Sequence, residues 1–125
     1  MSVAEDIMYR LNRNAVIGED DDGAIVMIED VTDTDGRFYR LEHRSSPDGR
    51  HAIAKCLYSP WGAVNGGEEY SVGHVAEDGF LCLGSDHPGR GVEDSPYDIE
   101  YVIKRARYWC TGFSYLKEHG DFPQM

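Results

Sequence analysis

Residues 74–83 read His-Val-Ala-Glu-Asp-Gly-Phe-Leu-Cys-Leu, and this stretch decides how the rest of the chain is interpreted. The Glu-Asp-Gly triplet predicts a turn, because aspartate and glycine both favour tight turns. The apolar residues 80–83 after it predict a short buried segment. A cysteine in such a segment is more often a small core residue than a nucleophile. On spacing alone, Cys82 would therefore lie in a buried strand.

Three strands are predicted before this stretch, at residues 24–28, 38–43 and 51–58. They are rich in β-branched or aromatic residues, or alternate between apolar and polar side chains, as strands do. Turn-forming residues such as Asp, Gly and Pro separate them. Residues 70–75 are predicted to add a fourth strand. The expected sheet is therefore an antiparallel four-stranded meander, followed by a loop over residues 84–94.

A helix is predicted at each end of the sequence. Ser2 and Glu5 form a capping-box pattern before apolar residues at helical spacing, which predicts a first helix over residues 3–13. A long C-terminal helix is predicted over residues 96–117, with Ser95 as its N-cap, and its aromatic residues are expected to be mostly core. The order of helix, strands, loop and helix indicates an α+β fold, with residues 1–125 as one domain.

The composition narrows the functional classes. The 23 acidic and 12 basic residues give a formal net charge of −11, which argues against nucleic acid and anionic membranes as partners. The acidic run at residues 19–22 is interpreted as a solvated loop. No long apolar stretch or secretory leader is recognisable, so the protein is predicted to be cytoplasmic.

The three cysteines, Cys56, Cys82 and Cys110, are an odd number with no CxxC pair. This pattern is typical of free thiols in a reducing compartment. No cysteine and histidine residues share the spacing of a structural zinc site. Neither a metal nor a cofactor is therefore expected.

The segment Gly79-Phe80-Leu81-Cys82-Leu83 resembles the active-site region of ubiquitin-conjugating (E2-like, UBC-like) enzymes, where Gly-x-(Ile/Leu)-Cys-Leu follows a histidine. His74 stands at the histidine position. The short gap between His74 and Cys82 looks closer to compact bacterial members of the family. Val75-Ala76 stands where eukaryotic members carry Pro-Asn. The order of elements resembles the family over the whole chain, whereas the specific motif covers ten residues.

The resemblance implies that Cys82 accepts the C-terminal acyl group of a ubiquitin-like modifier, or of a nucleotide-signalling synthase, from an activating (E1-like) enzyme. An amine would then attack the thioester. Asp78 would orient or deprotonate that amine, and His74 would brace the loop. His87 is a candidate acid, base or gate, or simply an exposed loop histidine. Such relatives occur in bacterial antiphage defence, and exposed aromatic residues on the last helix would suit a homodimer.

Two alternatives remain open at this point. The chain could be an inactive scaffold of the same fold that binds a modifier or synthase. It could also be a small α+β binding module whose three cysteines are inert. The position of Cys82 separates these hypotheses. A thiol buried in a regular strand favours a binding module, whereas a thiol at the lip of a groove beside His74 favours the enzyme.

Overall fold

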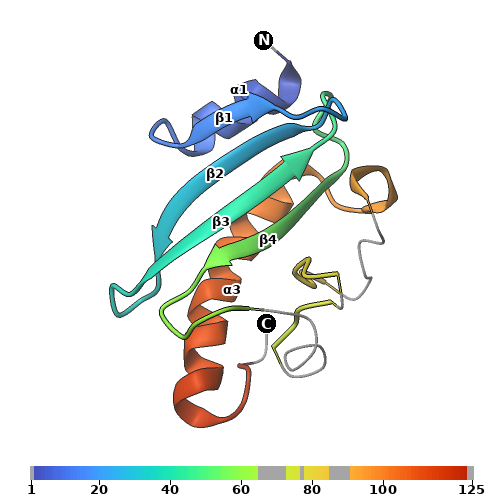
Figure 1. Cartoon of the computed structure of the whole chain (residues 1–125). Coiled ribbons are helices and arrows are strands. Elements are labelled where there is room, and N and C mark those ends of the chain that lie inside the picture. Colours follow the sequence, from blue (N-terminus) through green and yellow to red (C-terminus); the bar gives the residue numbers. More distant parts are fainter. Residues whose placement is uncertain (1, 65–72, 77, 85–90, 124–125) are drawn as a thin grey trace.

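Four antiparallel strands pair in the order of the sequence and form one sheet (Figure 1). They are β1 (Val16–Glu19), β2 (Ile25–Thr32), β3 (Phe38–Ser45) and β4 (Ala52–Tyr58). The computed structural model describes residues 2–64, 73–76, 78–84 and 91–123. The predicted α+β class and the four-stranded meander are confirmed, and β2, β3 and β4 contain or nearly match the three strands predicted first.

The fourth strand is not the one that the sequence predicted. Residues 70–72 of the predicted strand lie outside the described residues, and Val75 forms only an isolated bridge with Leu81. The fourth strand is instead β1, which pairs with β2 from Glu19 opposite Ile25. The acidic run is therefore the turn of a hairpin. Its Asp20 carboxylate accepts two backbone N–H groups at 3.0 Å, which accounts for an aspartate at this position.

Both predicted helices are present, with shifted ends. Helix α1 (Val3–Leu11) begins at the predicted capping box and ends two residues early, at an extended Asn12. Helix α3 (Ile99–His119) begins at Asp98, which accepts the Tyr101 N–H at 2.9 Å, and not at Ser95. Gly120 ends this helix in the left-handed conformation that glycine favours.

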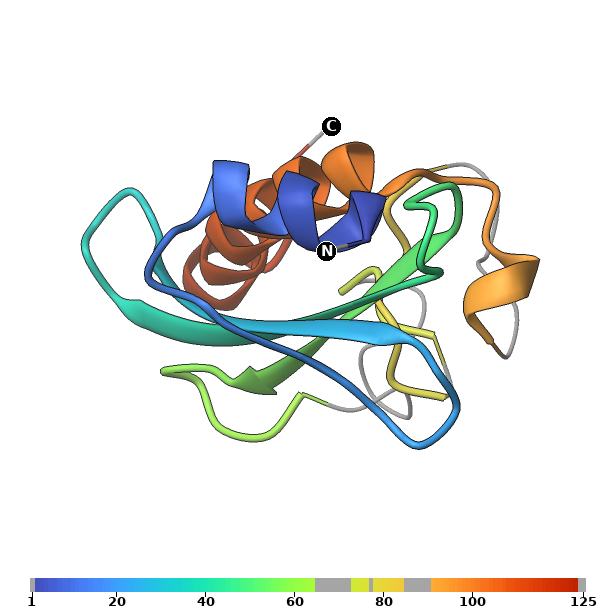
Figure 2. The ribbon, with the colours of Figure 1, turned by 90° about the horizontal axis from the view of Figure 1, so that it is seen from above.

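The helices α1 and α3 lie on the same face of the sheet (Figure 2). The hydrophobic core lies between this face and the two helices. Tyr39 on β3 and Trp109 on α3 are fully buried there, with ring centroids 6.1 Å apart. Phe113 is also buried, whereas Tyr108 and Tyr115 are about half exposed. The prediction that the helix aromatics are mostly core therefore holds for Trp109 and Phe113 only. No helix in the described part of the chain has the length and apolar character needed to cross a bilayer.

A buried ionic cluster joins both helices to the sheet. The Glu29 carboxylate on β2 is 2% exposed and receives hydrogen bonds from Arg107 on α3 at 2.7 and 3.1 Å. His43 Nε2 lies 2.7 Å from Glu29, and Asn12 Nδ2 donates to it at 2.9 Å. Burial alone would raise the pKa of Glu29, but the contacts with His43, Arg107 and Asn12 outweigh it and lower the pKa to about 2. Glu29 is therefore held ionised inside the core.

Candidate functional site

The segment from His74 to Cys82 folds as a tight hairpin. The Cys82 N–H donates to the His74 carbonyl at 2.8 Å, and Ala76 and Phe80 are joined in the same way at 2.8 Å. Gly79 has a φ of 88°, which the turn requires and which glycine adopts without strain. The predicted turn is thus present at Asp78-Gly79, whereas Glu77 lies outside the described residues.

Backbone groups anchor this hairpin to the sheet and to α3. The Leu81 N–H donates to the Ala54 carbonyl of β4 at 2.9 Å. At the start of the hairpin, the buried Trp109 indole donates to the Gly73 carbonyl at 2.8 Å. At its end, the Leu83 carbonyl accepts the Tyr101 hydroxyl at 2.8 Å. The position of the hairpin is therefore fixed from both ends.

Cys82 does not lie in a regular buried strand. Leu81 and Leu83 on either side are buried, at 1% and 2% exposure, whereas Phe80 and Cys82 are partly exposed. Successive side chains of an extended segment point to opposite sides, so Phe80 and Cys82 project away from the core. The strand that spacing predicted is replaced by a hairpin end whose leucines are buried and whose thiol is accessible.

The three thiols are all free but differ in environment. Burial raises the pKa of Cys82, and the negative charge of Asp78 raises it further. Burial raises the pKa of Cys56 to about 12, and burial also raises that of Cys110 on the buried face of α3. Cys82 is the thiol that the fold places at a hairpin end, and the two described influences on it, burial and Asp78, both disfavour the thiolate.

His74 supports the hairpin through its backbone and its ring. It adopts a φ of 57°, unusual for a residue other than glycine. Its ring packs on Phe122, with centroids 4.4 Å apart, and burial lowers its pKa. Among the described contacts of His74, none joins the ring to the Cys82 thiol, so the geometry suits a brace. His87 lies outside the described residues.

Asp78 lies in the turn, where its Oδ1 accepts the Phe80 N–H at 3.1 Å. Its side chain is exposed, and its charge acts on Cys82. The hairpin thus brings three of the four predicted site residues together: His74, Asp78 and Cys82. Within the described ranges, no group of three or more His, Cys, Asp or Glu side chains lies close enough to hold a metal ion.

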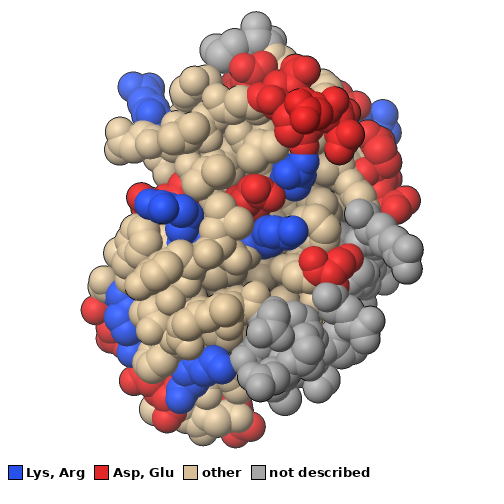
Figure 3. Space-filling model, in the orientation of Figure 1, with Lys and Arg blue, Asp and Glu red and all other residues tan. Residues whose placement is uncertain are grey.

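A cavity of about 480 Å³ is lined by Ile53 and Lys55 of β4, which alternate with core residues and so lie on the face opposite the helices. Its apolar walls include Ile53 and Phe80, and Lys55 Nζ lies 4.6 Å from the Phe80 ring centroid. Asp22 and Glu93 also line it. On the face seen in Figure 3, acidic side chains gather towards the upper right. Along β4, Ile53 and Lys55 lie on either side of the core residue Ala54. Along the hairpin, Phe80 and Cys82 lie in the same way on either side of the core residue Leu81, whose N–H donates to Ala54. Cys82 therefore projects to the side of the sheet on which this cavity opens.

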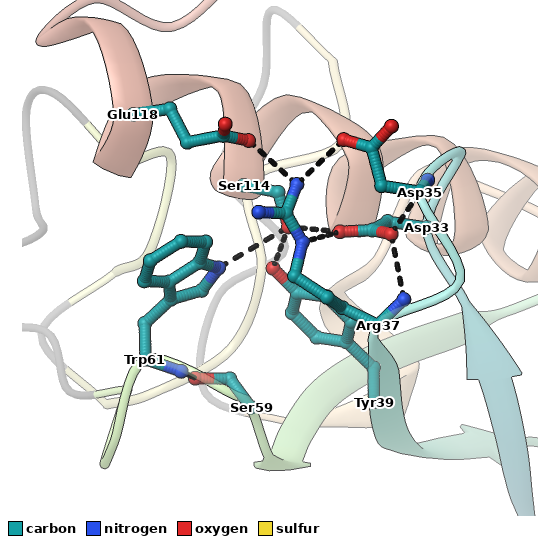
Figure 4. Close-up of polar contacts among 8 residues, drawn as sticks. All are labelled: Asp33, Asp35, Arg37, Tyr39, Ser59, Trp61, Ser114 and Glu118. Carbon is teal, nitrogen blue, oxygen red and sulfur yellow. Dashed lines mark hydrogen bonds and ion pairs between the residues drawn. The ribbon is translucent and has the colours of Figure 1, made fainter.

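A second polar cluster, which the sequence did not indicate, lies at the far end of α3 (Figure 4). Ser114 Oγ donates to Asp33 at 2.6 Å, lies 2.6 Å from the Tyr39 hydroxyl and accepts the indole N–H of Trp61 at 3.2 Å. A serine beside a carboxylate resembles a nucleophilic pair. However, Ser114 is 2% exposed and its oxygen is fully engaged, so the cluster is structural. Through Trp61, this cluster holds the segment that follows β4 against α3.

Comparison of the chain with protein-family models, curated proteins and solved structures returned no match. What the hairpin can do chemically therefore follows from its own residues. A partly exposed thiol on an anchored backbone can accept an acyl group, provided that the group arrives already activated.

Proposed function

We propose that this protein is a conjugating enzyme of the ubiquitin-conjugating (E2-like) type, with Cys82 as the residue that carries the acyl group. The observation that carries the proposal is the hairpin from His74 to Cys82, which leaves the thiol partly exposed on the side of the sheet where the cavity opens. The order of helix, meander, hairpin and helix agrees with what the sequence resemblance implies.

The proposed reaction has two acyl transfers. The Cys82 sulfur attacks the carbonyl carbon of a thioester on an activating enzyme, forming a new C–S bond and releasing the thiol of that enzyme. An amine then attacks the carbonyl carbon, forming an amide bond and breaking the C–S bond, so that Cys82 is released as a thiolate. The amine loses one proton in this step. Neither transfer needs an oxidant or a metal, because a thioester is already an activated acyl group.

Asp78 is the proposed acceptor for that proton, because its exposed side chain lies in the turn of the same hairpin, near enough for it to contribute to the raised pKa of Cys82. His74 is proposed to hold the hairpin through the carbonyl that accepts the Cys82 N–H. The cavity beside Phe80 would receive the polypeptide that approaches the thioester. His87 keeps its role as a candidate acid, base or gate.

The partners remain those that the resemblance implies: a ubiquitin-like modifier or a synthase C-terminus, and an activating enzyme. A bacterial defence setting, a cytoplasmic location and a homodimer belong to the same proposal. The exposed Tyr108 and Tyr115 on α3 would suit a partner or dimer surface. The net charge of −11 supports a protein partner over nucleic acid or an anionic membrane.

Intact mass spectrometry tests the proposal. The protein is incubated with an activating enzyme, ATP and candidate modifiers, and wild type is compared with Cys82→Ser and with Cys56→Ser as the matched control. We expect a reducible adduct on wild type and on Cys56→Ser. Cys82→Ser should give a stable ester or no adduct. An adduct that survives Cys82→Ser and is still reducible would contradict the assignment of Cys82.

An inactive scaffold of the same fold is the second candidate, and one observation favours it. The pKa of Cys82 is raised by burial and by Asp78, the opposite of what an activated nucleophile requires. The absence of any adduct, together with slow alkylation of Cys82 under native conditions, would favour this scaffold or a small binding module.

A further inference from the structure

The chain turns back on itself after α3 and returns to the hairpin. Gly120 adopts a φ of 88° and its N–H caps the helix on the Leu116 carbonyl at 2.7 Å. Two residues later, the Phe122 ring packs on His74 with centroids 4.4 Å apart. Phe122 therefore contacts the histidine at which the hairpin begins.

Gly112 of α3 provides the space that Phe122 occupies. A Cβ atom at Gly112 would lie 2.5 Å from Phe122 Cζ and 2.8 Å from Cε1. Such distances do not occur between non-bonded carbon atoms, so any other residue at position 112 would displace the ring. Glycine disfavours the middle of a helix by about 1 kcal/mol relative to alanine, so its presence here needs a packing reason. The close packing of the Phe122 ring against Gly112 is that reason.

We propose that Phe122 is a positioning residue: seated against Gly112, it holds the His74 ring, and through the His74 carbonyl it fixes the backbone of Cys82. The contact runs from α3 through Phe122 to His74, and the His74 carbonyl accepts the Cys82 N–H at 2.8 Å. The positive φ of His74 needs such support, because this conformation is strained for residues other than glycine. A role of Phe122 in catalysis rests on the proposed function, whereas the contact between Phe122 and His74 does not.

Phe122→Ala tests the device through two readouts that need no modifier or activating enzyme. Proton NMR titration of the His74 ring should give a pKa closer to the ordinary histidine value of about 6.5, because burial lowers it in the intact protein. Amide exchange at Cys82 should become faster by roughly two- to tenfold, the range expected for loss of one aromatic pair.

Gly112→Ala tests the same device from the other side. The added Cβ should expel the ring and give the same two changes, although alanine favours the helix more than glycine does. In the Phe122→Ala background there is no ring to expel, so Gly112→Ala should change neither readout further. Such non-additivity is the expected signature of two residues that act through one contact.

Unchanged His74 titration and unchanged Cys82 exchange in Phe122→Ala would overturn the inference. Additive effects of the two substitutions would overturn it as well, because they would mean two separate causes. A third outcome separates the two proposals. If wild type forms no thioester, but Phe122→Ala still changes both the His74 titration and the Cys82 exchange, the proposed function is rejected and the positioning role of Phe122 stands. A thioester assay on Phe122→Ala then measures how much the device contributes to loading.

Discussion

Replacing Glu29 by glutamine should weaken the fold strongly at neutral pH and have little effect in acid. The glutamine side chain keeps the size and one acceptor oxygen of Glu29 but removes the charge that faces Arg107 and His43. A pKa lowered from 4.5 to about 2 corresponds to roughly 3 kcal/mol of stabilisation at pH 7, since one pKa unit is about 1.4 kcal/mol. We therefore expect Glu29→Gln to lose about that amount of unfolding free energy.

The pH dependence of this loss follows from the direction of the shift. A carboxyl group whose pKa is lower in the folded state stabilises the protein fully above its unfolded pKa, near 4.5. That stabilisation disappears as the pH falls through the folded pKa, near 2. The difference between wild type and Glu29→Gln should therefore be constant above about pH 5 and shrink towards zero near pH 2.

Urea unfolding at a series of pH values measures this difference directly, because urea is uncharged. Asp30→Asn is the matched control, since Asp30 is the next residue, is exposed and pairs with Arg40 at 2.8 Å on the surface. It should change the unfolding free energy by less than about 1 kcal/mol. A Glu29→Gln loss that stays the same from pH 7 to pH 2 would refute the reasoning, because it would show that ionisation of Glu29 is not what stabilises the cluster.

Three further substitutions have expected outcomes. Asp78→Asn should speed alkylation of Cys82 by iodoacetamide at neutral pH by roughly two- to fivefold, because it removes a nearby negative charge that raises the thiol pKa. Peptide mass mapping measures the alkylation rate of Cys82 separately from the other thiols. An unchanged rate would contradict the charge effect. Ser114→Ala should lower the unfolding free energy in urea by roughly 1–3 kcal/mol, because it removes the buried hydrogen bonds that Ser114 Oγ makes with Asp33, Tyr39 and Trp61. Trp61→Phe removes only one hydrogen bond of that cluster and should lose about 1 kcal/mol, so equal losses would argue against Ser114 as its centre.

The elements that the sequence predicted are those with a strong local signal. The capping box of α1 and the helical spacing of apolar residues in α3 depend only on neighbouring residues, and both helices are present. β1 was missed because it has only two large apolar residues, Val16 and Ile17, before a run of acids. Its signal was the Asp-Gly turn at Asp22-Gly23, which is typical of a hairpin between two strands.

The contacts that complete the site join residues far apart in the sequence. Arg107 reaches Glu29 across 78 positions, and Phe122 reaches His74 in the same way from the end of the chain. Periodicity carries no information on such pairs, because it reports only which face of an element is buried. One sign was available for Glu29, which follows Ile25 and Met27 on the same face of its strand. A charge on an apolar face indicates a buried partner.

The surroundings of Cys82 have a consequence for the proposed mechanism. A thiol whose pKa is raised provides little thiolate at pH 7, so its loading depends on an acyl donor that is already a thioester. The carboxylate that contributes to this raised pKa belongs to Asp78, the residue proposed to accept the proton when an amine attacks. Asp78 would therefore slow the first transfer and assist the second. Asp78→Asn should separate the two steps, since it would load Cys82 faster and discharge it to an amine more slowly, and a carboxylate with no part in catalysis would leave discharge unchanged.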